Sequence, residues 1–298
     1  MSNPKNEKVV ELHAVLSVFK PISTAVVQAR IQPLREILGG HGYSRLNKIG
    51  AWRNDNDINI TWEGDNTVLI QQTARFITNG LKKKMKGKQV PFKTLSFLSK
   101  FEEVQTQKLV VNEAKDLKNV NMLTDMIEFK CNLLLQKSVA KLTELIGNNV
   151  GPFDAWNASQ VFYLQNLARS YGELYVFNCF RSKIDQLVES PTRNVLLDLL
   201  QLYALTVVER DLVLLRENDF IQSEVCDMIR NEILEICNRL KNELITILDV
   251  ISPPDEILGA ALGSSTGFIF ENYLNSVYNF KGCFERADWW EILHHKKI

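Results

Sequence analysis

The 298-residue chain has little of what organises several common classes of protein. Its five cysteines are widely spaced and include no C-x-x-C pair, which excludes a disulfide framework and a zinc finger. Histidine is also scarce: His13 has no second ligand at metal-binding spacing, His41 lies in a glycine loop, and His294 and His295 lie at the end of the chain. We therefore expect reduced thiols and no metal site.

Charge of one sign and long apolar runs are missing as well. Thirty-five basic residues balance thirty-five acidic ones, so no overall field attracts the chain to nucleic acid or to an anionic membrane. The first ten residues, MSNPKNEKVV, lack the apolar segment of a secretory signal, and no run approaches the roughly 18 uncharged residues that span a bilayer. The sequence predicts a soluble, intracellular protein without membrane insertion.

Apolar residues recur at helical spacing through most of the chain, and only 14 glycines and 8 prolines interrupt them. The pattern predicts an all-α fold with a domain boundary near residue 100, giving domains 1–100 and 101–298. Long amphipathic helices are expected at about 118–146, 154–187, 191–216 and 222–250, packed as an antiparallel bundle, with a shorter helix near 267–279. Pro21 is expected to separate or kink two helices within residues 7–38, and residues 39–61 to form loops.

The basic segment KKKMKGK, residues 82–88, has two interpretations. It could attract phosphate, or it could be the solvated end of a helix, where the negative end of the helix dipole favours lysine. From the sequence we favour the second.

The segment from Ile37 to Phe76 differs in kind. Gly39 and Gly40 allow close approach of a phosphate or another chain, and Glu63 lies between Trp62 and Gly64 at the start of a helix. A carboxylate beside a large aromatic ring is a candidate base, because burial raises its pKa into a range useful for proton abstraction. Alternatively Glu63 caps the following helix, and physical reasoning alone favours this second interpretation. Asp65 lies where a carboxylate is stabilised at the helix start.

Four stretches carry a resemblance to a known family: LREILGGHGYSRLNKIG, RNDNDINITWEGDNTVLIQQTARF, LDVISPPDEILG and FERADWW. In these the chain resembles the peroxisomal acyl-CoA oxidases of the acyl-CoA dehydrogenase superfamily, and the last two are similar to the branched-chain, pristanoyl-type group. The similarity extends over essentially the whole chain and corresponds to the carboxy-terminal half of such an enzyme, with its helical bundles.

The resemblance implies FAD-dependent oxidation of fatty acyl-CoA to trans-2-enoyl-CoA, with molecular oxygen reduced to hydrogen peroxide. It assigns Glu63 as the base that removes the Cα proton. Gly39 and Gly40 are assigned to the FAD of the neighbouring subunit of a homodimer, and Asp65 and Thr67 to flavin contacts. The family's amino-terminal and β-domains, which hold most of the flavin, have no counterpart here, and Trp62 replaces the usual Tyr or Phe.

Peroxisomal localisation is implied in the same way, although the chain ends HHKKI where many family members end in S-K-L. Two other interpretations stay open. One is a non-catalytic helical interaction module derived from an oxidase. The other is an acyl-CoA dehydrogenase that passes electrons to a protein, which is disfavoured because dehydrogenases generally lack a helical domain like residues 100–298.

Overall fold

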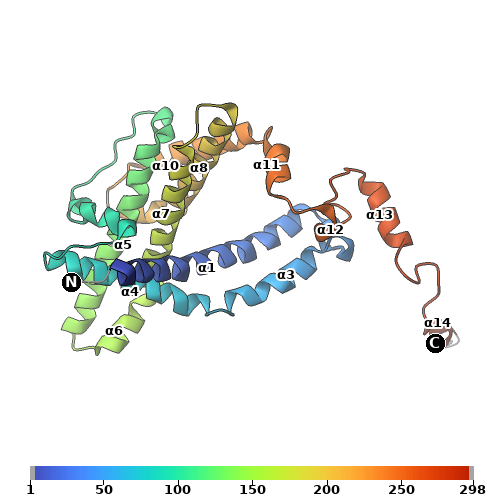
Figure 1. Ribbon diagram of the computed structural model, residues 1–298, viewed down its shortest axis with the longest axis horizontal. Coiled ribbons are helices and arrows are strands. Elements are labelled where there is room, and N and C mark those ends of the chain that lie inside the picture. The colour runs from blue at the N-terminus through green and yellow to red at the C-terminus, as the bar shows by residue number, and fades with distance from the viewer. Residues whose placement is uncertain (1–3, 295–298) are drawn as a thin grey trace. The chain divides into compact units, whose positions relative to one another are not determined.

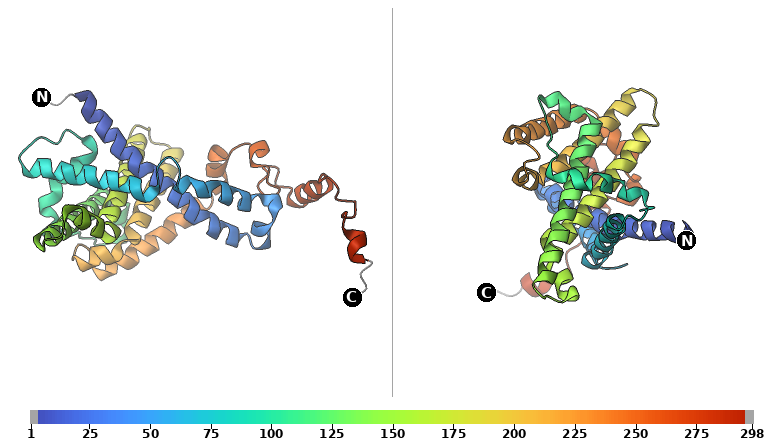
Figure 2. Two further views of the ribbon diagram at one scale, coloured as in Figure 1. Left: turned by 90° about the horizontal axis from the view of Figure 1, so that it is seen from below. Right: turned by 90° about the vertical axis from the view of Figure 1, so that its left-hand side faces the viewer.

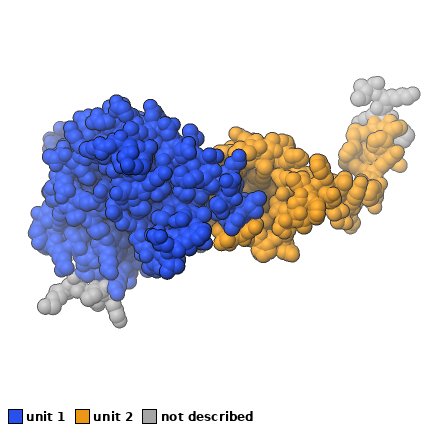
Figure 3. All heavy atoms as spheres, turned by 90° about the horizontal axis from the view of Figure 1, so that it is seen from above, with its two compact units in different colours: residues 1–23, 61–248 blue, residues 24–60, 249–298 orange. Residues whose placement is uncertain are grey.

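A computed structural model describes residues 4–294 of the chain, and all regular structure in this range is helical (Figure 1). The all-α prediction is confirmed. The described residues form two compact units (Figure 3): unit 1 contains the residues up to 23 together with 61–248, and unit 2 contains 24–60 and the residues from 249 onward. The boundary near residue 100 between two family domains stays a prediction.

Unit 1 is a helical bundle. Its long helices are α4 (Asn66–Met85), α5 (Val120–Gly147), α7 (Gln165–Ile184), α8 (Pro191–Glu209) and α10 (Ser223–Leu240). Shorter pieces connect them: η3 (Lys93–Gln105), η4 (Ala114–Lys118), α6 (Pro152–Ala158), the π-helical turn η5 (Gln160–Leu164) and α9 (Leu212–Glu217). Helices α5, α7 and α8 pack on one another and α10 packs on α8, while α4 lies against α7 (Figures 1 and 2). Helix is therefore present in all four expected ranges, but three of them are divided: 154–187 by η5, 191–216 between α8 and α9, and 222–250 after Leu240, where α10 ends before a further helix at 244–251.

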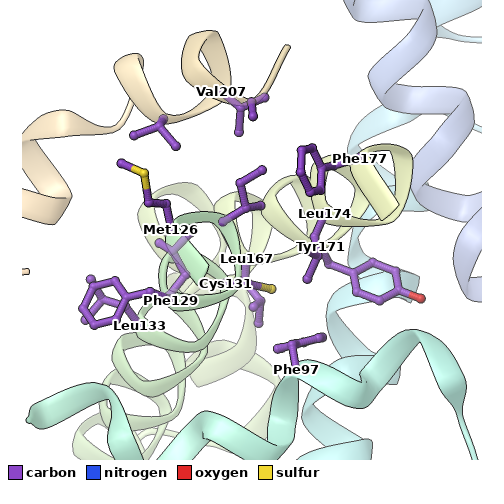
Figure 4. Close-up of a cluster of buried hydrophobic side chains, with 14 of the residues drawn as sticks. Phe97, Met126, Phe129, Cys131, Leu133, Leu167, Tyr171, Leu174, Phe177 and Val207 are labelled. Carbon is purple, nitrogen blue, oxygen red and sulfur yellow. The ribbon is translucent and has the colours of Figure 1, made fainter. Parts of the chain in front are cut away.

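The core of unit 1 lies between these helices. Figure 4 shows part of it, with Phe97 from η3, Met126 and Phe129 from α5, and Leu167 and Phe177 from α7, all almost inaccessible to solvent. Burying one such side chain contributes roughly 1.5–3 kcal/mol. Phe129 also stacks on Phe220, with ring centroids 3.6 Å apart. The core thus fixes α5 and α7 relative to one another and provides the frame on which α4 rests.

Charged side chains also lie inside this core. Lys130 on α5 is 1% exposed, and its Nζ lies 2.7 Å from Glu173 Oε2 of α7 and 2.7 Å from Asp211 Oδ2. Arg210 Nη2 lies 2.7 Å from the other oxygen of Glu173. The ammonium therefore joins α5, α7 and the end of α8, and both buried charges have partners of opposite sign. No sequence pattern indicated this network.

All five cysteines are free, and Cys131 is fully buried beside Lys130 in α5. Burial raises the pKa of the Cys131 thiol, so that the nucleophilic thiolate is suppressed. We expect a thiol reagent at about pH 8 to modify Cys131 only after unfolding. The number of reactive thiols in the protein should be higher in denaturant than in the native state by at least one. Rapid labelling of Cys131 in the native chain, detected by peptide mapping, would contradict the core described above.

Burial likewise raises the pKa values of Tyr171 and Tyr203. An acid whose folded-state pKa exceeds its unfolded value keeps its proton longer when folded. The stability that such a group contributes to the folded state is fully present below its pKa in the unfolded chain. This stability declines as the pH rises above that pKa. Stability should therefore fall from about pH 8.5 upward, where the thiol begins to titrate in the unfolded chain.

Helix α1 (Pro4–Ile37) is one element with Pro21 buried inside it, so the proline does not separate two helices as one of the two expectations had it. The reason is close packing on both sides of the proline. A Cβ atom added at Gly172 of α7 would lie 2.4 Å from Ile22 and 2.8 Å from Val18, so the two helices touch where only glycine fits. This contact outweighs the hydrogen bond that a proline removes.

The same helix bears on a second expectation. Residues 6–37 contain an 18-residue window with a mean hydropathy of 1.4, so α1 is long and apolar enough to cross a bilayer. The core helix of a soluble protein meets the same criterion, and Ala14, Val15 and Val18 do pack in the core of unit 1. Glu11, Lys20 and Arg30 interrupt this helix, so none of its uncharged runs approaches 18 residues and the prediction made from the sequence stands.

Unit 2 contains the second part of α1 followed by short helices: α2 (Gly40–Tyr43), η1 (Arg45–Asn47), α3 (Ile49–Asp57) and η2 (Ile58–Ile60). From the carboxy-terminal region it contains α12 (Asp255–Leu258), α13 (Ile269–Tyr278) and α14 (Trp290–His294), and α11 (Leu244–Ile251) precedes them. The helix expected near 267–279 is confirmed as α13, whereas His295 and the final residues lie outside the described range.

The expectation of loops at 39–61 was wrong, since most of these residues are helical. Side-chain hydrogen bonds from α1 support α3: Gln28 donates to Asp57 Oδ1 at 3.0 Å and accepts from Asn56 Nδ2 at 2.8 Å. Arg53 donates to Gln32 Oε1 at 2.7 Å. The Asn and Asp side chains that usually compete with a helix are thus occupied by bonds to a neighbouring helix.

Candidate functional site

The residues predicted as functional fall into two groups. Glu63, Asp65 and Thr67 lie together in unit 1, where the chain turns into α4. Gly39 and Gly40 lie in unit 2, where α1 ends and α2 begins. The two groups are therefore described separately, each within its own unit.

Glu63 occupies a tight turn with an uncommon backbone conformation. Its φ angle is +54°, and Gly64 follows with φ +100°. Two successive residues in the left-handed region reverse the chain sharply, and a glutamate is rarely found there. Glycine is favoured at the second position because a φ of +100° strains any residue with a side chain, and a Cβ atom there would in addition lie 2.9 Å from the Leu69 side chain. The turn places the Glu63 side chain on the surface of unit 1.

Asp65 begins α4. Its Oδ1 atom accepts hydrogen bonds from the backbone N–H of Thr67 at 2.8 Å and of Val68 at 3.3 Å. Asp65 is therefore the N-cap, as the sequence indicated, and the alternative in which Glu63 caps the helix is wrong. Because a neighbour supplies the cap, the Glu63 carboxylate is not needed to start α4 and is available for another purpose.

Lys20 of α1 holds this turn from the other side. Its Nζ atom donates to the carbonyl oxygen of Gly64 at 2.7 Å and to Asn66 Oδ1 at 2.8 Å. Farther along, the hydroxyl of Thr73 donates to the carbonyl of Ala14 at 2.7 Å in the buried interface of α4 with α1. The ammonium thus bonds to the residues on both sides of Asp65. Sequence reasoning missed Lys20, because nothing in the sequence shows that residues 44 positions apart meet.

Replacing Lys20 with methionine should loosen the turn without unfolding unit 1. The two hydrogen bonds to a charged donor disappear, while the cap at Asp65 and the contact of Thr73 remain. We expect amide hydrogen exchange of residues 63–68 to accelerate by roughly tenfold, the equivalent of about 1.4 kcal/mol in local opening. Lys8→Met, at an exposed position of the same helix, serves as the matched control. Equal exchange in all three proteins would show that Lys20 does not hold the turn.

The environment of Glu63 differs from the expected one. A desolvated carboxylate beside Trp62 was expected, but Glu63 is exposed and Trp62 is 53% exposed. The residues described here therefore position the carboxylate without burying it. Shielding from water, if the carboxylate acts as a base, has to come from a bound substrate or from other polypeptide.

Gly39 and Gly40 form an open backbone edge. Gly39 has φ +56° and ψ −135°, a region suited to glycine, and it is the N-cap of α2. A Cβ atom at either glycine would meet no atom within 4 Å. Packing inside unit 2 therefore does not require glycine at either position. The backbone at Gly40 is exposed, so a ligand or another chain can reach it.

A cavity of about 1090 Å³ lies in the same region, lined by residues that follow this edge and by residues of α1. Four basic side chains line it: Arg35, Arg45, Lys48 and Arg53. They are candidates for binding phosphate groups. Sequence reasoning missed them, although four basic residues between positions 35 and 53, around a glycine pair, were a usable signal.

Asn47, which is 2% exposed, anchors the chain after the glycine pair. It donates to the carbonyl of His41 at 2.7 Å and to the hydroxyl of Tyr273, and it accepts from the backbone N–H of Leu262 at 2.9 Å. His41 Nδ1 also lies 3.0 Å from that tyrosine hydroxyl. The carboxy-terminal segment of unit 2 therefore fixes the conformation of α2 and η1, next to Gly39.

Fold and site together define a class: an all-helical protein that presents a glutamate on an aromatic–Glu–Gly turn and an open Gly–Gly edge beside basic residues. Comparison with known proteins gives the family. Residues 119–298 match the family described as acyl-CoA oxidase, and residues 1–78 match the acyl-CoA oxidase C-alpha1 domain. The chain belongs to the acyl-CoA oxidase family, as its sequence motifs indicated.

Individual relatives agree with this assignment. The chain is 32% identical over 285 residues to human (Homo sapiens) peroxisomal acyl-coenzyme A oxidase 3, a match covering 94% of this chain and 41% of that protein. The solved acyl-CoA oxidase of tomato (Lycopersicon esculentum) superimposes with a TM-score of 0.87 at 20% identity, over 95% of this chain and 43% of that one. Acyl-CoA oxidase-2 of Caenorhabditis elegans, solved with FAD, ascaroside-CoA and ATP, gives 0.83 at 22% identity, over 94% and 40%. The chain thus spans about two fifths of the length of these relatives.

Proposed function

We propose that this chain supplies the catalytic base and part of the cofactor-binding surface of a peroxisomal acyl-CoA oxidase. The reaction is the α,β-dehydrogenation of a fatty acyl-CoA to the trans-2-enoyl-CoA, with oxygen reduced to hydrogen peroxide. The observation that carries the proposal is the turn at Glu63, where a carboxylate that is not needed as a helix cap is held outward by two left-handed residues.

In this proposal the Glu63 carboxylate accepts the Cα proton of the acyl-CoA thioester. Lys20 and Asp65 fix the backbone that follows Glu63, so that the point from which its side chain extends is held in place. A bound FAD would supply the acceptor for the hydride from Cβ and the route by which the electrons reach oxygen. The bulky Trp62 beside the base limits the space next to the thioester.

The residues around Gly39 fit a flavin nucleotide. The open glycine edge admits a phosphate group close to the backbone, and the basic side chains Arg45 and Lys48 are of the charge a pyrophosphate requires. Asp65 and Thr67 are proposed as further flavin contacts at the start of α4. We propose in addition that two copies form a homodimer in which the glycine edge of one copy contacts the FAD of the other.

The decisive experiment joins this chain to the amino-terminal part of a relative such as the human oxidase 3. The joined protein should bind FAD and convert fatty acyl-CoA and oxygen to enoyl-CoA and peroxide, whereas the chain alone should retain little flavin after gel filtration. A joined protein that folds and binds FAD but forms neither product would instead support a non-catalytic interaction module.

A further inference from the structure

Helix α4 and the start of α1 form a cleft of about 560 Å³ within unit 1. From α4 it receives side chains at three- and four-residue spacing, which is one face of the helix. We use the name basic cleft for the site defined by its basic side chains: His13, Arg75, Lys82, Lys83, Lys86 and Lys88. Gln72 and Asn79 add amide groups, and no Asp or Glu lines the cleft. None of these residues belongs to the Glu63 turn or to the Gly39–Gly40 edge.

The positive charge of the basic cleft is not neutralised by the protein. Among residues 4–294, no ion pair includes Arg75 or any of the four lysines of the cleft. Lys84, in the same turn of α4 but not part of the cleft, shows the contrast: its Nζ lies 2.6 Å from Glu102 and donates to the carbonyl of Leu98 at 2.6 Å. Lys84, which lies outside the cleft, thus has an acidic partner, whereas the lysines of the cleft have none within the described residues.

The end of α4 explains the presence of some of the basic residues in the cleft but not of all of them. Lys82 and Lys83 lie in the last turn of α4, where the helix dipole favours cations. Arg75 lies about two turns earlier, beyond the reach of that effect, and Lys88 follows the end of the helix. Gathering these like charges at one cleft is unfavourable unless an anion joins them.

The floor of the cleft is apolar. Val10 and Ala14 of α1 and the rings of Phe76 and Phe92 contribute to it, and the two rings pack with centroids 4.9 Å apart. Lys83 Nζ lies 5.0 Å from the centre of the Phe92 ring. An apolar wall excludes water from one side of a bound ion, which strengthens its attraction to the surrounding cations.

We propose that the basic cleft binds a small soluble ligand with two or more phosphate groups. Five cationic side chains match a ligand of three to four negative charges better than a monophosphate, and the guanidinium of Arg75 suits paired phosphate oxygens. The cleft volume is within the range of small-molecule sites, which extends from roughly 300 to 1,000 Å³. The segment KKKMKGK thus serves as a binding element as well as a helix end.

The test uses the whole 298-residue chain and inorganic triphosphate, measured by isothermal titration calorimetry in about 50 mM salt, where screening is modest. We expect one triphosphate per chain with a micromolar Kd. The double variant K82E/K83E should bind at least tenfold more weakly. The control K183E/K241E changes the net charge equally, at exposed lysines that also lie at helix ends, and should bind within about threefold of the parent.

Three results would overturn the proposal. They are no saturable binding by the parent, equal weakening in both double variants, and equal affinity for citrate, a trianion without phosphate. The variant K86Q/K88Q, which alters only residues beyond the end of α4, repeats the test if K82E/K83E does not fold. Circular dichroism of each variant establishes its fold before titration.

Discussion

Replacing Glu63 with glutamine in the protein joined to its amino-terminal part should reduce enoyl-CoA and peroxide formation at least a hundredfold while leaving FAD bound. Glutamine keeps the shape of the side chain but cannot accept the proton, and a positioned general base contributes roughly 10²–10⁴-fold. Because Asp65 caps α4, the substitution should leave the helix and the thermal unfolding temperature unchanged. Activity and flavin content are measured on the same sample.

Glu144→Gln is the matched control, since this exposed carboxylate of α5 lies 2.9 Å from Lys141 and has no part in the site. It should keep the parent activity. Loss of flavin together with loss of activity in Glu63→Gln would indicate a folding defect. Turnover within about threefold of the parent, with flavin retained, would remove Glu63 from the role of base.

Lys130→Met should have the largest effect on stability. Methionine fills a similar volume but leaves Glu173, which is 5% exposed, with Arg210 as its single cationic partner, and Asp211 loses its ion pair. Breaking a buried ion pair by removing one partner lowers the free energy of unfolding by about 3–5 kcal/mol. Because Arg210 still pairs with Glu173, we expect a loss at the lower end, about 3 kcal/mol. The measurement is urea unfolding followed by circular dichroism.

Lys141→Met provides the comparison, because it removes a partly exposed lysine of the same helix that pairs with the exposed Glu144. Its urea midpoint should equal that of the parent. Equal midpoints for Lys130→Met and the parent would mean that the buried network adds nothing to the stability of unit 1.

Much of the helical architecture could be predicted, because burial of one face imposes a period of 3.6 residues on the sequence. That period located α5, α7, α8 and α10 closely. Two errors arose where tertiary contacts outweighed local preference. Pro21 stays within α1 because Val18 and Ile22 press on Gly172 of α7, and α3 forms because bonds from α1 occupy its polar side chains.

The site was predictable only where its determinants are local. Asp65 was identified as the cap because a capping carboxylate and the helix it starts are adjacent in sequence. Lys20 and Lys130 were not identified, because their partners lie 44 and 43 residues away and no periodic pattern marks such pairs. The exposure of Glu63 was also missed, since an adjacent tryptophan does not by itself bury a carboxylate.

The central claim is that Glu63 of this chain removes the Cα proton, and hydrogen exchange at that carbon tests it most directly. The joined protein is incubated with a fatty acyl-CoA in deuterated water without oxygen, and deuterium at Cα is measured by mass spectrometry. The account predicts incorporation with the parent and at least a hundredfold slower incorporation with Glu63→Gln. Equal rates in the two proteins would contradict it, because another group would then be removing the proton.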